Sequence, residues 1–230
     1  MPRRRKEAVS QKPAPAAATV LVTGFEAFGG ESVNPSWQVC GMLPAQIGGA
    51  RVETCRVPCE FRRAIETVAE AIERTRPAIV LCLGQAGGRA QMSVERVAIN
   101  IDDARIEDNA GARPIDVPVA PLGPPAYFAT LPVKAMVAAM REARVPAELS
   151  NSAGTFVCNH LMYGVLHVLR ARGHHTRAGF IHVPYGEGQV LERPGVPALA
   201  IETMVRGVEA AIGAALAHAQ DIVAGEGRLD

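Results

Sequence analysis

Short apolar runs alternate with longer amphipathic stretches along this chain. Residues 19–23, 78–83 and 178–183 are apolar almost throughout, and the first two runs lead directly into Gly24 and Gly84. Continuous apolar segments of this length are typical of strands that are covered on both faces. The pattern therefore predicts three strands buried in the centre of a sheet.

Helical spacing of apolar residues fills much of the rest of the chain. It predicts helices over 37–43, 61–74, 131–144, 156–172 and 199–224, with further strands over 51–57, 95–102 and 147–151. Alternating strands and helices are typical of an α/β fold. We expect a single three-layer α/β domain, a mostly parallel twisted sheet with helices on both faces, as in phosphorylase and hydrolase folds. Ligands bind beyond the carboxyl ends of such strands, which places the site near Gly24, Gly84 and Tyr185.

Two segments fall outside this alternation. Residues 1–17 are basic and rich in Pro and Ala, without the apolar core of a secretory signal, so we expect a disordered tail and a domain over 18–230. Residues 107–130 are rich in Pro, Gly and Asp. A long irregular loop of this kind is usually functional or part of an interface.

Composition narrows the classes of function. The chain has 230 residues, of which 48% are hydrophobic and 20% charged, and its net charge is +1. This balance argues against a protein dedicated to nucleic acid or to a membrane surface. No apolar run approaches the ~20 residues that a membrane-spanning helix needs.

Cysteine usage favours a reducing compartment, so we expect a cytoplasmic protein. The chain has five cysteines, an odd number, and no second ligand pair accompanies Cys55 and Cys59 to complete a zinc site. Cys40 and Cys82 also lie in apolar surroundings, and all four are expected to be packed thiols. No metal or other cofactor is expected.

The glycine-rich loops do not fit nucleotide binding. Gly24 and Gly29 have the spacing of a P-loop, but Gly30 and Glu31 stand where the lysine and the hydroxyl residue are required. The segment 84–89 lacks the first two glycines of a dinucleotide fingerprint. These loops fit either turns that need glycine or backbone drawn close to a small ligand.

Cys158 falls in the first turn of the predicted helix over 156–172. Amide N–H groups at a helix N-terminus stabilise a thiolate, lower the pKa of the thiol and can hold an oxyanion. Position alone leaves Cys158 open between a nucleophile and a buried structural thiol. His160 is two residues further on, about 200° around the helix, so it is poorly placed to act on Cys158.

His182 and Glu95 are the other two candidates for catalysis. His182 interrupts an apolar strand near its carboxyl end, which fits either a satisfied core histidine or a general base. Glu95 shares strand parity with the apolar Val97 and Ile99, and a carboxylate on a buried face needs a partner. A structural ion pair with Arg89 and the orientation of a catalytic histidine both meet that need.

Four segments of this sequence resemble the pyroglutamyl peptidase I family, also called pyrrolidone-carboxylate peptidases. The segments are TGFEAFGGESVNPSW at 23–37, GQAGGR followed by VERVAIN over 84–100, SAGTFVCNH at 152–160 and GFIHVPY at 179–185. All stand in the family's order, and the resemblance extends from about residue 19 to residue 215. The tail 1–17 has no counterpart in it, and 113–125 and 186–188 match loosely.

The resemblance implies a cysteine exopeptidase that removes an N-terminal pyroglutamyl residue through a thioester. Cys158 would be the nucleophile, His182 the base and Glu95 the carboxylate that orients it, while Arg105 and the Cys158 N–H would hold the oxyanion. The residues implied for the pyroglutamate pocket are Phe25, Phe28, Asn34, Gln85 and Ile106. The family also implies peptide substrates, no metal, and a cytosolic homo-oligomer, either tetramer or dimer.

Two alternatives remain at this point. Nucleoside phosphorylases use similar sheets with sites at the same strand ends, but they need cationic phosphate contacts and give Cys158 no role. A non-catalytic relative would keep the sheet and carry a Cys158 of ordinary reactivity.

Overall fold

The computed structural model describes residues 18–226, so the predicted tail 1–17 and the last four residues of the predicted domain lie outside the described residues. Seven strands form the central sheet in the order β2-β3-β1-β4-β9-β5-β8. They are β1 (Thr19–Phe25), β2 (Gln46–Ile47), β3 (Ala50–Val57), β4 (Ile79–Gln85), β5 (Met92–Glu95), β8 (Ala147–Ser150) and β9 (Arg177–Val183).

The four central strands β3, β1, β4 and β9 are parallel, and the edges of the sheet are mixed. Strand β2 runs antiparallel to β3, while β5 runs antiparallel to β9 and parallel to β8. The three predicted apolar runs form β1, β4 and β9. Every residue of β1 and β4 is buried, as expected for strands covered on both faces.

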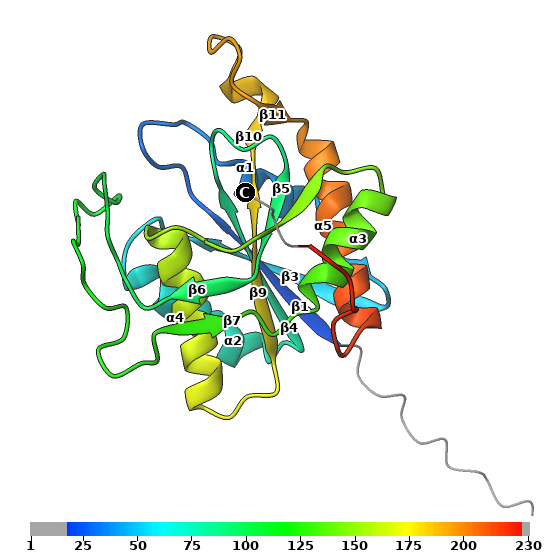
Figure 1. Cartoon of the computed structure of the whole chain (residues 1–230), viewed down its shortest axis with the longest axis horizontal. Coiled ribbons are helices and arrows are strands. Elements are labelled where there is room, and N and C mark those ends of the chain that lie inside the picture. The colour runs from blue at the N-terminus through cyan, green and yellow to red at the C-terminus, as the bar shows by residue number, and fades with distance from the viewer. Residues whose placement is uncertain (1–17, 227–230) are drawn as a thin grey trace, which may run out of the picture.

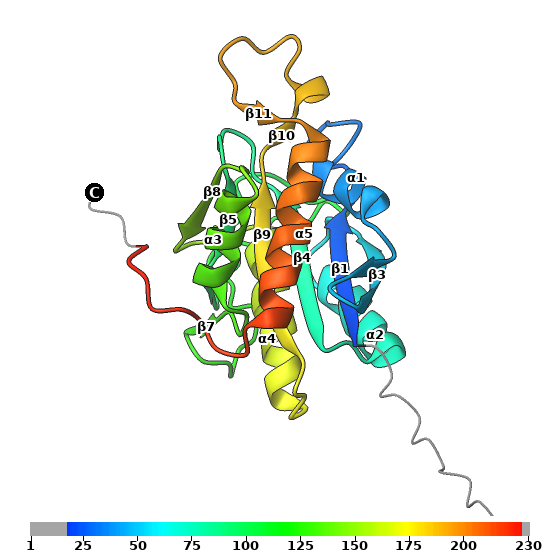
Figure 2. The same cartoon turned by 90° about the vertical axis from the view of Figure 1, so that its right-hand side faces the viewer.

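Helices cover both faces of this sheet (Figures 1 and 2). They are α1 (Pro35–Met42), α2 (Arg63–Thr75), α3 (Val133–Glu142), α4 (Val157–Ala171) and α5 (Ile201–Ala217). Helices α1, α3 and α5 pack into one apolar core, and α2 and α4 pack into the other. The three-layer α/β architecture is therefore confirmed.

Two smaller β-pairs lie outside the central sheet. Strands β6 (Val97–Ile99) and β7 (Ala126–Phe128) form one, and β10 (Tyr185–Gly186) and β11 (Ala198–Leu199) form the other. The 3-10 turn η1 (Glu187–Gln189) lies between β10 and β11, in a segment that stands out beyond the carboxyl end of β9 in both views (Figures 1 and 2).

The predicted continuous strand over 95–102 is wrong, because the segment is divided between the end of β5 at Glu95 and the separate short strand β6. The backbone of Arg96 bonds to β8 through its N–H and to the residue after β7 through its carbonyl, so the chain leaves the central sheet there. Ala98 is then fully buried and Ile99 is 37% exposed, which reverses the predicted alternation. Glu95 keeps its predicted burial because it still belongs to β5.

The predicted helix over 199–224 is too long, because α5 ends at Ala217. The chain then turns so that the Asp221 carboxylate accepts hydrogen bonds from the backbone N–H groups of Lys134 and Ala135. Pro132, at the N-cap of α3, supplies no side-chain cap. Asp221 therefore satisfies amide groups that the start of α3 leaves open.

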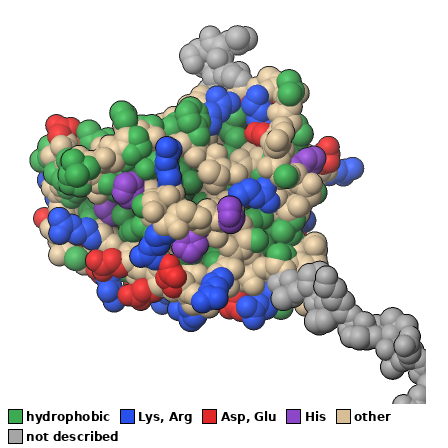
Figure 3. Space-filling model, turned by 90° about the horizontal axis from the view of Figure 1, so that it is seen from below, with side chains coloured by type: hydrophobic (Ala, Val, Ile, Leu, Met, Phe, Trp, Pro, Cys, Tyr) green, Lys and Arg blue, Asp and Glu red, His purple; other side chains and the backbone are tan. Residues whose placement is uncertain are grey.

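The surface at the amino ends of the strands carries mixed charges. Acidic, basic and histidine side chains are interspersed with apolar ones on this face (Figure 3). Within residues 18–226, no helix is long and apolar enough to cross a membrane.

Candidate active site

The carboxyl ends of β4 and β9 meet the amino end of α4 on the face of the sheet that α2 and α4 cover. Gly84 on β4 and His182 on β9 are partners across the parallel ladder. Paired residues on neighbouring strands are about 4.8 Å apart and direct their side chains to the same face. This register places the imidazole of His182 beside a position that has no side chain.

A buried carboxylate holds the imidazole from the next strand. His182 Nδ1 lies 2.7 Å from Glu95 Oε1, and the two side chains are 5% and 0% exposed. Glu95 reaches His182 diagonally, because its own ladder partner on the antiparallel β9 is Phe180. With Nδ1 engaged by the carboxylate, Nε2 is the nitrogen that can serve a neighbouring thiol.

Arg89 contacts the same carboxylate oxygen. Its Nη1 lies 2.7 Å from Glu95 Oε1, and its Nη2 lies 3.4 Å from the carbonyl oxygen of Ser152, in the loop that leads to α4. Glu95 therefore pairs with Arg89 and also holds the ring of His182, so the two contacts that the sequence suggested for this carboxylate occur together. Burial alone would raise the pKa of Glu95, but the hydrogen bond from His182 and the charge of Arg89 outweigh it and lower the pKa.

Cys158 approaches the sheet at Gly84. A Cβ built at Gly84 would lie 2.8 Å from Cys158 Sγ and 2.7 Å from the Phe180 ring. Any side chain at this position would displace the sulfur, so glycine is required for the close approach and not for its backbone angles. Because Gly84 is the ladder partner of His182, the thiol and the imidazole lie on one face of the sheet at neighbouring strand positions.

A helix N-terminus alone would lower the pKa of Cys158, but other effects outweigh it here. Burial, reinforced by the negative charge of Glu95, raises the pKa of this thiol to about 12 despite its place in the first turn of α4. Burial likewise lowers the pKa of His182, although Glu95 acts in the opposite direction. At neutral pH the two groups are therefore a thiol and a neutral imidazole, so a thiolate at Cys158 would form only if a base removed its proton.

The amino end of α4 is uncapped. Its N-cap residue, Phe156, has no side-chain acceptor for the first amide groups, and the neighbouring Thr155 donates its hydroxyl to the carbonyl of Asp103 instead. The amide groups of a first helical turn have no partner within the helix. The N–H of Cys158 is thus placed to hold an oxygen of a bound molecule.

A cavity of about 720 Å³ opens beside this turn. Its walls include Phe28, Arg105 and Ile106, three of the residues implied by the family resemblance, and also Phe156. Phe156 was missed in the sequence, although its place two residues before Cys158 was an available signal. Its ring lies 6.1 Å from that of Phe28, so aromatic groups from two distant segments form one wall.

Comparisons with known proteins identify the family of this chain. The model of the family described as pyroglutamyl peptidase matches residues 18–218. The chain belongs to the pyroglutamyl peptidase family. A pyrrolidone-carboxylate peptidase of Escherichia fergusonii is 52% identical over 210 residues, which span 91% of this chain and 98% of the relative.

Solved structures of this family superpose on the whole domain. Pyroglutamyl peptidase I from Bacillus amyloliquefaciens is 41% identical with a TM-score of 0.88, over 91% of this chain and 100% of that one. The pyrrolidone carboxyl peptidase from Thermococcus litoralis is 40% identical with a TM-score of 0.84, over 87% and 94% of the two chains. Membership of the pyroglutamyl peptidase family gives no support to the phosphorylase alternative.

The other residues implied by the pyroglutamyl peptidase resemblance lie deeper than the cavity wall. Phe25 is 2% exposed and packs into the core beneath α2 and α4. Asn34 caps α1 by accepting from Ser36, and it donates to the carbonyl of Glu26, so its side chain shapes the loop after β1. Gln85 ends β4, and its Oε1 accepts a hydrogen bond from Gln189.

The other four cysteines of this member of the pyroglutamyl peptidase family are also free thiols. Cys40, Cys59 and Cys82 are buried and Cys55 is half-buried, and burial raises the pKa of each. Among residues 18–226, no three His, Cys, Asp or Glu side chains gather as ligands for a metal ion.

Proposed function

We propose that this protein is a cysteine exopeptidase that hydrolyses the bond after an N-terminal pyroglutamyl residue. The observation that carries the proposal is the position of Cys158. Its sulfur lies in the uncapped first turn of α4, against Gly84 and on the face of the sheet where His182 is held by a buried carboxylate. Family membership supplies the class of substrate.

The reaction begins with neutral groups. As Cys158 Sγ attacks the carbonyl carbon after the lactam ring, His182 Nε2 takes the thiol proton, and Glu95 stabilises the imidazolium that forms. The Cys158 N–H and Arg105 hold the negative oxygen of the tetrahedral intermediate. His182 then protonates the leaving amine as the C–N bond breaks, and water, deprotonated by His182, hydrolyses the thioester.

The cavity suits an uncharged ring. Phe28, Ile106 and Phe156 offer apolar walls to a five-membered lactam, which has no terminal ammonium. A peptide that begins with free glutamine would bring an ammonium group among these side chains. The free energy needed to move that charge out of water and against these apolar walls gives the selectivity.

The hydrogen bonds of Gln189 orient Gln85. Gln189 Oε1 accepts from the backbone N–H of Gly186, which leaves its Nε2 to donate to Gln85 Oε1 and Glu31 Oε2. Gln85 therefore uses its oxygen inside the protein and keeps its NH₂ group as a donor. We propose that this group donates to the lactam carbonyl, while a backbone carbonyl accepts from the lactam N–H.

Pyroglutamyl-β-naphthylamide and the matching glutaminyl compound test the activity. We expect release of naphthylamine from the first and none from the second, and we expect EDTA to leave the rate unchanged. Cys158→Ala and Cys158→Ser should abolish turnover. Alanine has no nucleophilic atom, and the serine hydroxyl is a much weaker nucleophile than the thiol. Cys55→Ser, a half-buried thiol away from His182, is the matched control and should keep wild-type turnover.

Cleavage by Cys158→Ala at the wild-type rate would contradict the mechanism. So would inhibition by EDTA that added zinc reverses. Cleavage of the glutaminyl compound would contradict the assignment of substrate.

A cytoplasmic location and assembly into a dimer or tetramer are also part of the proposal. The five free cysteines fit a reducing compartment. Light scattering on the full-length chain in solution measures the assembly, with a monomeric mass as the contrary result.

A further inference from the structure

One segment supplies two walls of the cavity beside the first turn of α4. This segment, which we call the bridge and which spans residues 103–109, contributes Arg105 and Ile106 to the cavity. Within the part of the chain that the structure describes, residues 105–107 form no hydrogen bond. The bridge is therefore held in place at its two ends.

The first end is tied to the loop that leads to α4. The backbone N–H of Asp103 donates to the carbonyl of Thr155 at 2.9 Å, and the Thr155 hydroxyl donates to the carbonyl of Asp103 at 2.7 Å. Thr155 stands three residues before Cys158 and lines the cavity itself. This end of the bridge is thus fixed to the segment that leads to Cys158.

The second end is tied to the loop after β1 by the side chain of Asn109. Its NH₂ group donates to Glu26 Oε1 at 2.8 Å and to the backbone carbonyl of Ala27 at 2.9 Å. Ala27 directly precedes Phe28, which lines the same cavity from that loop. One amide group therefore joins the segment that carries Ile106 to the segment that carries Phe28.

Both partners in this contact are attached to the segment after β3. Glu26 Oε1 also accepts the backbone N–H of Cys59 at 3.2 Å, and the backbone N–H of Glu26 donates to the carbonyl of Val57. The backbone N–H of Asn109 donates to the carbonyl of Cys59 at 3.0 Å. These bonds bring the amide donor and the carboxylate acceptor together.

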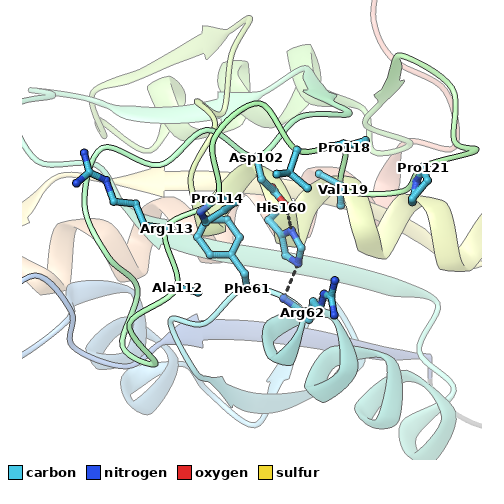
Figure 4. Close-up of a pocket in the computed structure, with 11 residues that line it drawn as sticks. Phe61, Arg62, Asp102, Ala112, Arg113, Pro114, Pro118, Val119, Pro121 and His160 are labelled. Carbon is cyan, nitrogen blue, oxygen red and sulfur yellow. Dashed lines mark hydrogen bonds and ion pairs between the residues drawn. The ribbon is translucent and has the colours of Figure 1, made fainter.

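Asp108 holds the turn from which the Asn109 side chain projects. Its Oδ2 accepts the backbone N–H of Phe61 at 2.8 Å, and its Oδ1 accepts those of Ala110 and Ala112. Figure 4 shows Phe61 and Ala112 close together in the wall of a neighbouring cavity of about 580 Å³. Because Asp108 fixes the backbone here, a substitution of the Asn109 side chain changes only what that amide joins.

We propose that Asn109 is a positioning residue of the pyroglutamate pocket, which sets the separation of Phe28 and Ile106. The proposal rests on the proposed function, because it takes the lactam ring to lie between these two side chains. Ile106 is 48% exposed, so core packing does not fix it. Within the described part of the chain, the two bonds of Asn109 are the only hydrogen bonds between the bridge and residues 26–30.

The chemistry of this contact requires an amide. Glu26 Oε1 and the Ala27 carbonyl are both acceptors, and Asn109→Asp keeps the shape of the side chain but has no proton to donate to them. Without the two bonds, the loops are correctly placed in a smaller fraction of the molecules. A ligand that needs both loops should then bind about tenfold more weakly.

The test measures KM for pyroglutamyl-β-naphthylamide and Ki for 2-pyrrolidone, which is the lactam ring alone. Both should rise about tenfold in Asn109→Asp. The acidic limb of the kcat/KM profile should keep its wild-type pH, since Asn109 contacts neither His182 nor Glu95. Gln46→Glu, the same change from amide to carboxylate on the exposed edge strand β2, is the matched control and should keep the wild-type KM and Ki.

Exchanging donor and acceptor tests the contact with Glu26 directly. The double variant Glu26→Gln/Asn109→Asp keeps the net charge, and the glutamine NH₂ group can donate to the new carboxylate. We expect Ki for 2-pyrrolidone to return to about threefold above the wild-type value, because the bond to Ala27 stays lost. A Ki as high as that of Asn109→Asp would contradict a role for the contact between Asn109 and Glu26.

Two outcomes separate this proposal from the proposed function. If the wild-type protein does not cleave the naphthylamide, the proposed function fails. If it does, and Asn109→Asp lowers the urea midpoint of unfolding while Ki and KM keep their wild-type values, only the positioning role fails, because Asn109 then contributes to stability alone.

Discussion

Two buried histidines in this molecule are held by carboxylates in nearly the same way. His182 Nδ1 lies 2.7 Å from Glu95, and His160 Nδ1 lies 2.8 Å from Asp102. Both rings are almost completely buried. A search for histidine–carboxylate pairs alone would find no difference between them.

The two pairs differ at the second ring nitrogen. His160 Nε2 accepts the backbone N–H of Arg62, so this ring joins the start of α2 to α4 and has no nitrogen left for a proton transfer. His182 stands beside Gly84, where Cys158 approaches. The comparison teaches that a carboxylate orients an imidazole in both places, and that the partner of Nε2 decides between structure and chemistry.

The largest expected contrast is between the two histidine-to-alanine variants. His182→Ala should lower kcat by about 10²–10⁴-fold, because proton transfer to and from the substrate is lost. His160→Ala should leave kcat near the wild-type value. Steady-state kinetics on the naphthylamide measure both, and a severe loss of kcat in folded His160→Ala would erase the distinction.

For stability we expect the reverse order, with the larger loss in His160→Ala. His160→Ala leaves the buried Asp102 carboxylate and the Arg62 N–H without their shared partner, which costs about 3 kcal/mol of the free energy of unfolding. Urea unfolding followed by circular dichroism measures it. We expect a smaller loss for His182→Ala, since Glu95 retains Arg89.

Replacing the carboxylate of each histidine–carboxylate pair should affect the pH dependence of kcat/KM differently. Glu95 raises the pKa of His182, so Glu95→Gln should lower that pKa further. Because the proposed mechanism uses the neutral imidazole as the base, the acidic limb of the kcat/KM profile should move to lower pH. Turnover should fall by less than in His182→Ala, since glutamine still accepts from Nδ1 but cannot stabilise the imidazolium.

Asp102→Asn serves as the control for this shift. Its acidic limb on the naphthylamide should stay at the wild-type pH, because Asp102 faces His160 and not His182. If Glu95→Gln keeps full activity and an unmoved limb, Glu95 is only a partner of Arg89. The site would then consist of Cys158 and His182 alone.

The sequence predicted the parts of the site that depend on local pattern. The apolar stripe of α4 placed Cys158 in its first turn, and the apolar run of β9 placed His182 near a strand end. Both positions follow from helix and strand periodicity, which nearby residues determine. The family resemblance also implied Phe28, Arg105 and Ile106, which meet in one cavity.

The rest depended on contacts between distant segments. Glu95 reaches His182 because β5 pairs with β9 in the antiparallel direction, and it also pairs with Arg89. No local sequence pattern indicates that strand pairing. Polar and apolar residues alternate over 95–102 without a break, so the sequence predicted one strand. The structure has two, because the chain passes from the central sheet to the β6–β7 pair within this segment. The raised pKa of Cys158 also escaped prediction, because it comes from burial by other segments and from the charge of Glu95.

The smallest expected effect is the most specific, because it has the opposite sign. Arg89 lowers the pKa of His182, so Arg89→Met should raise that pKa and move the acidic limb to higher pH, against the direction of Glu95→Gln. The shift should be modest, since the Arg89 side chain is 30% exposed and solvent screens its charge. Arg89→Lys keeps the charge and should leave the limb nearly in place.

The position of the limb separates two roles for Arg89. If Arg89 is only a structural ion-pair partner of Glu95, Arg89→Met should lower stability and leave the acidic limb at the wild-type pH. If the charge of Arg89 also acts on His182, the limb should move to higher pH. Measuring kcat/KM against pH for the three variants under one buffer system decides between these, and a downward shift in Arg89→Met would contradict the assigned electrostatics of His182.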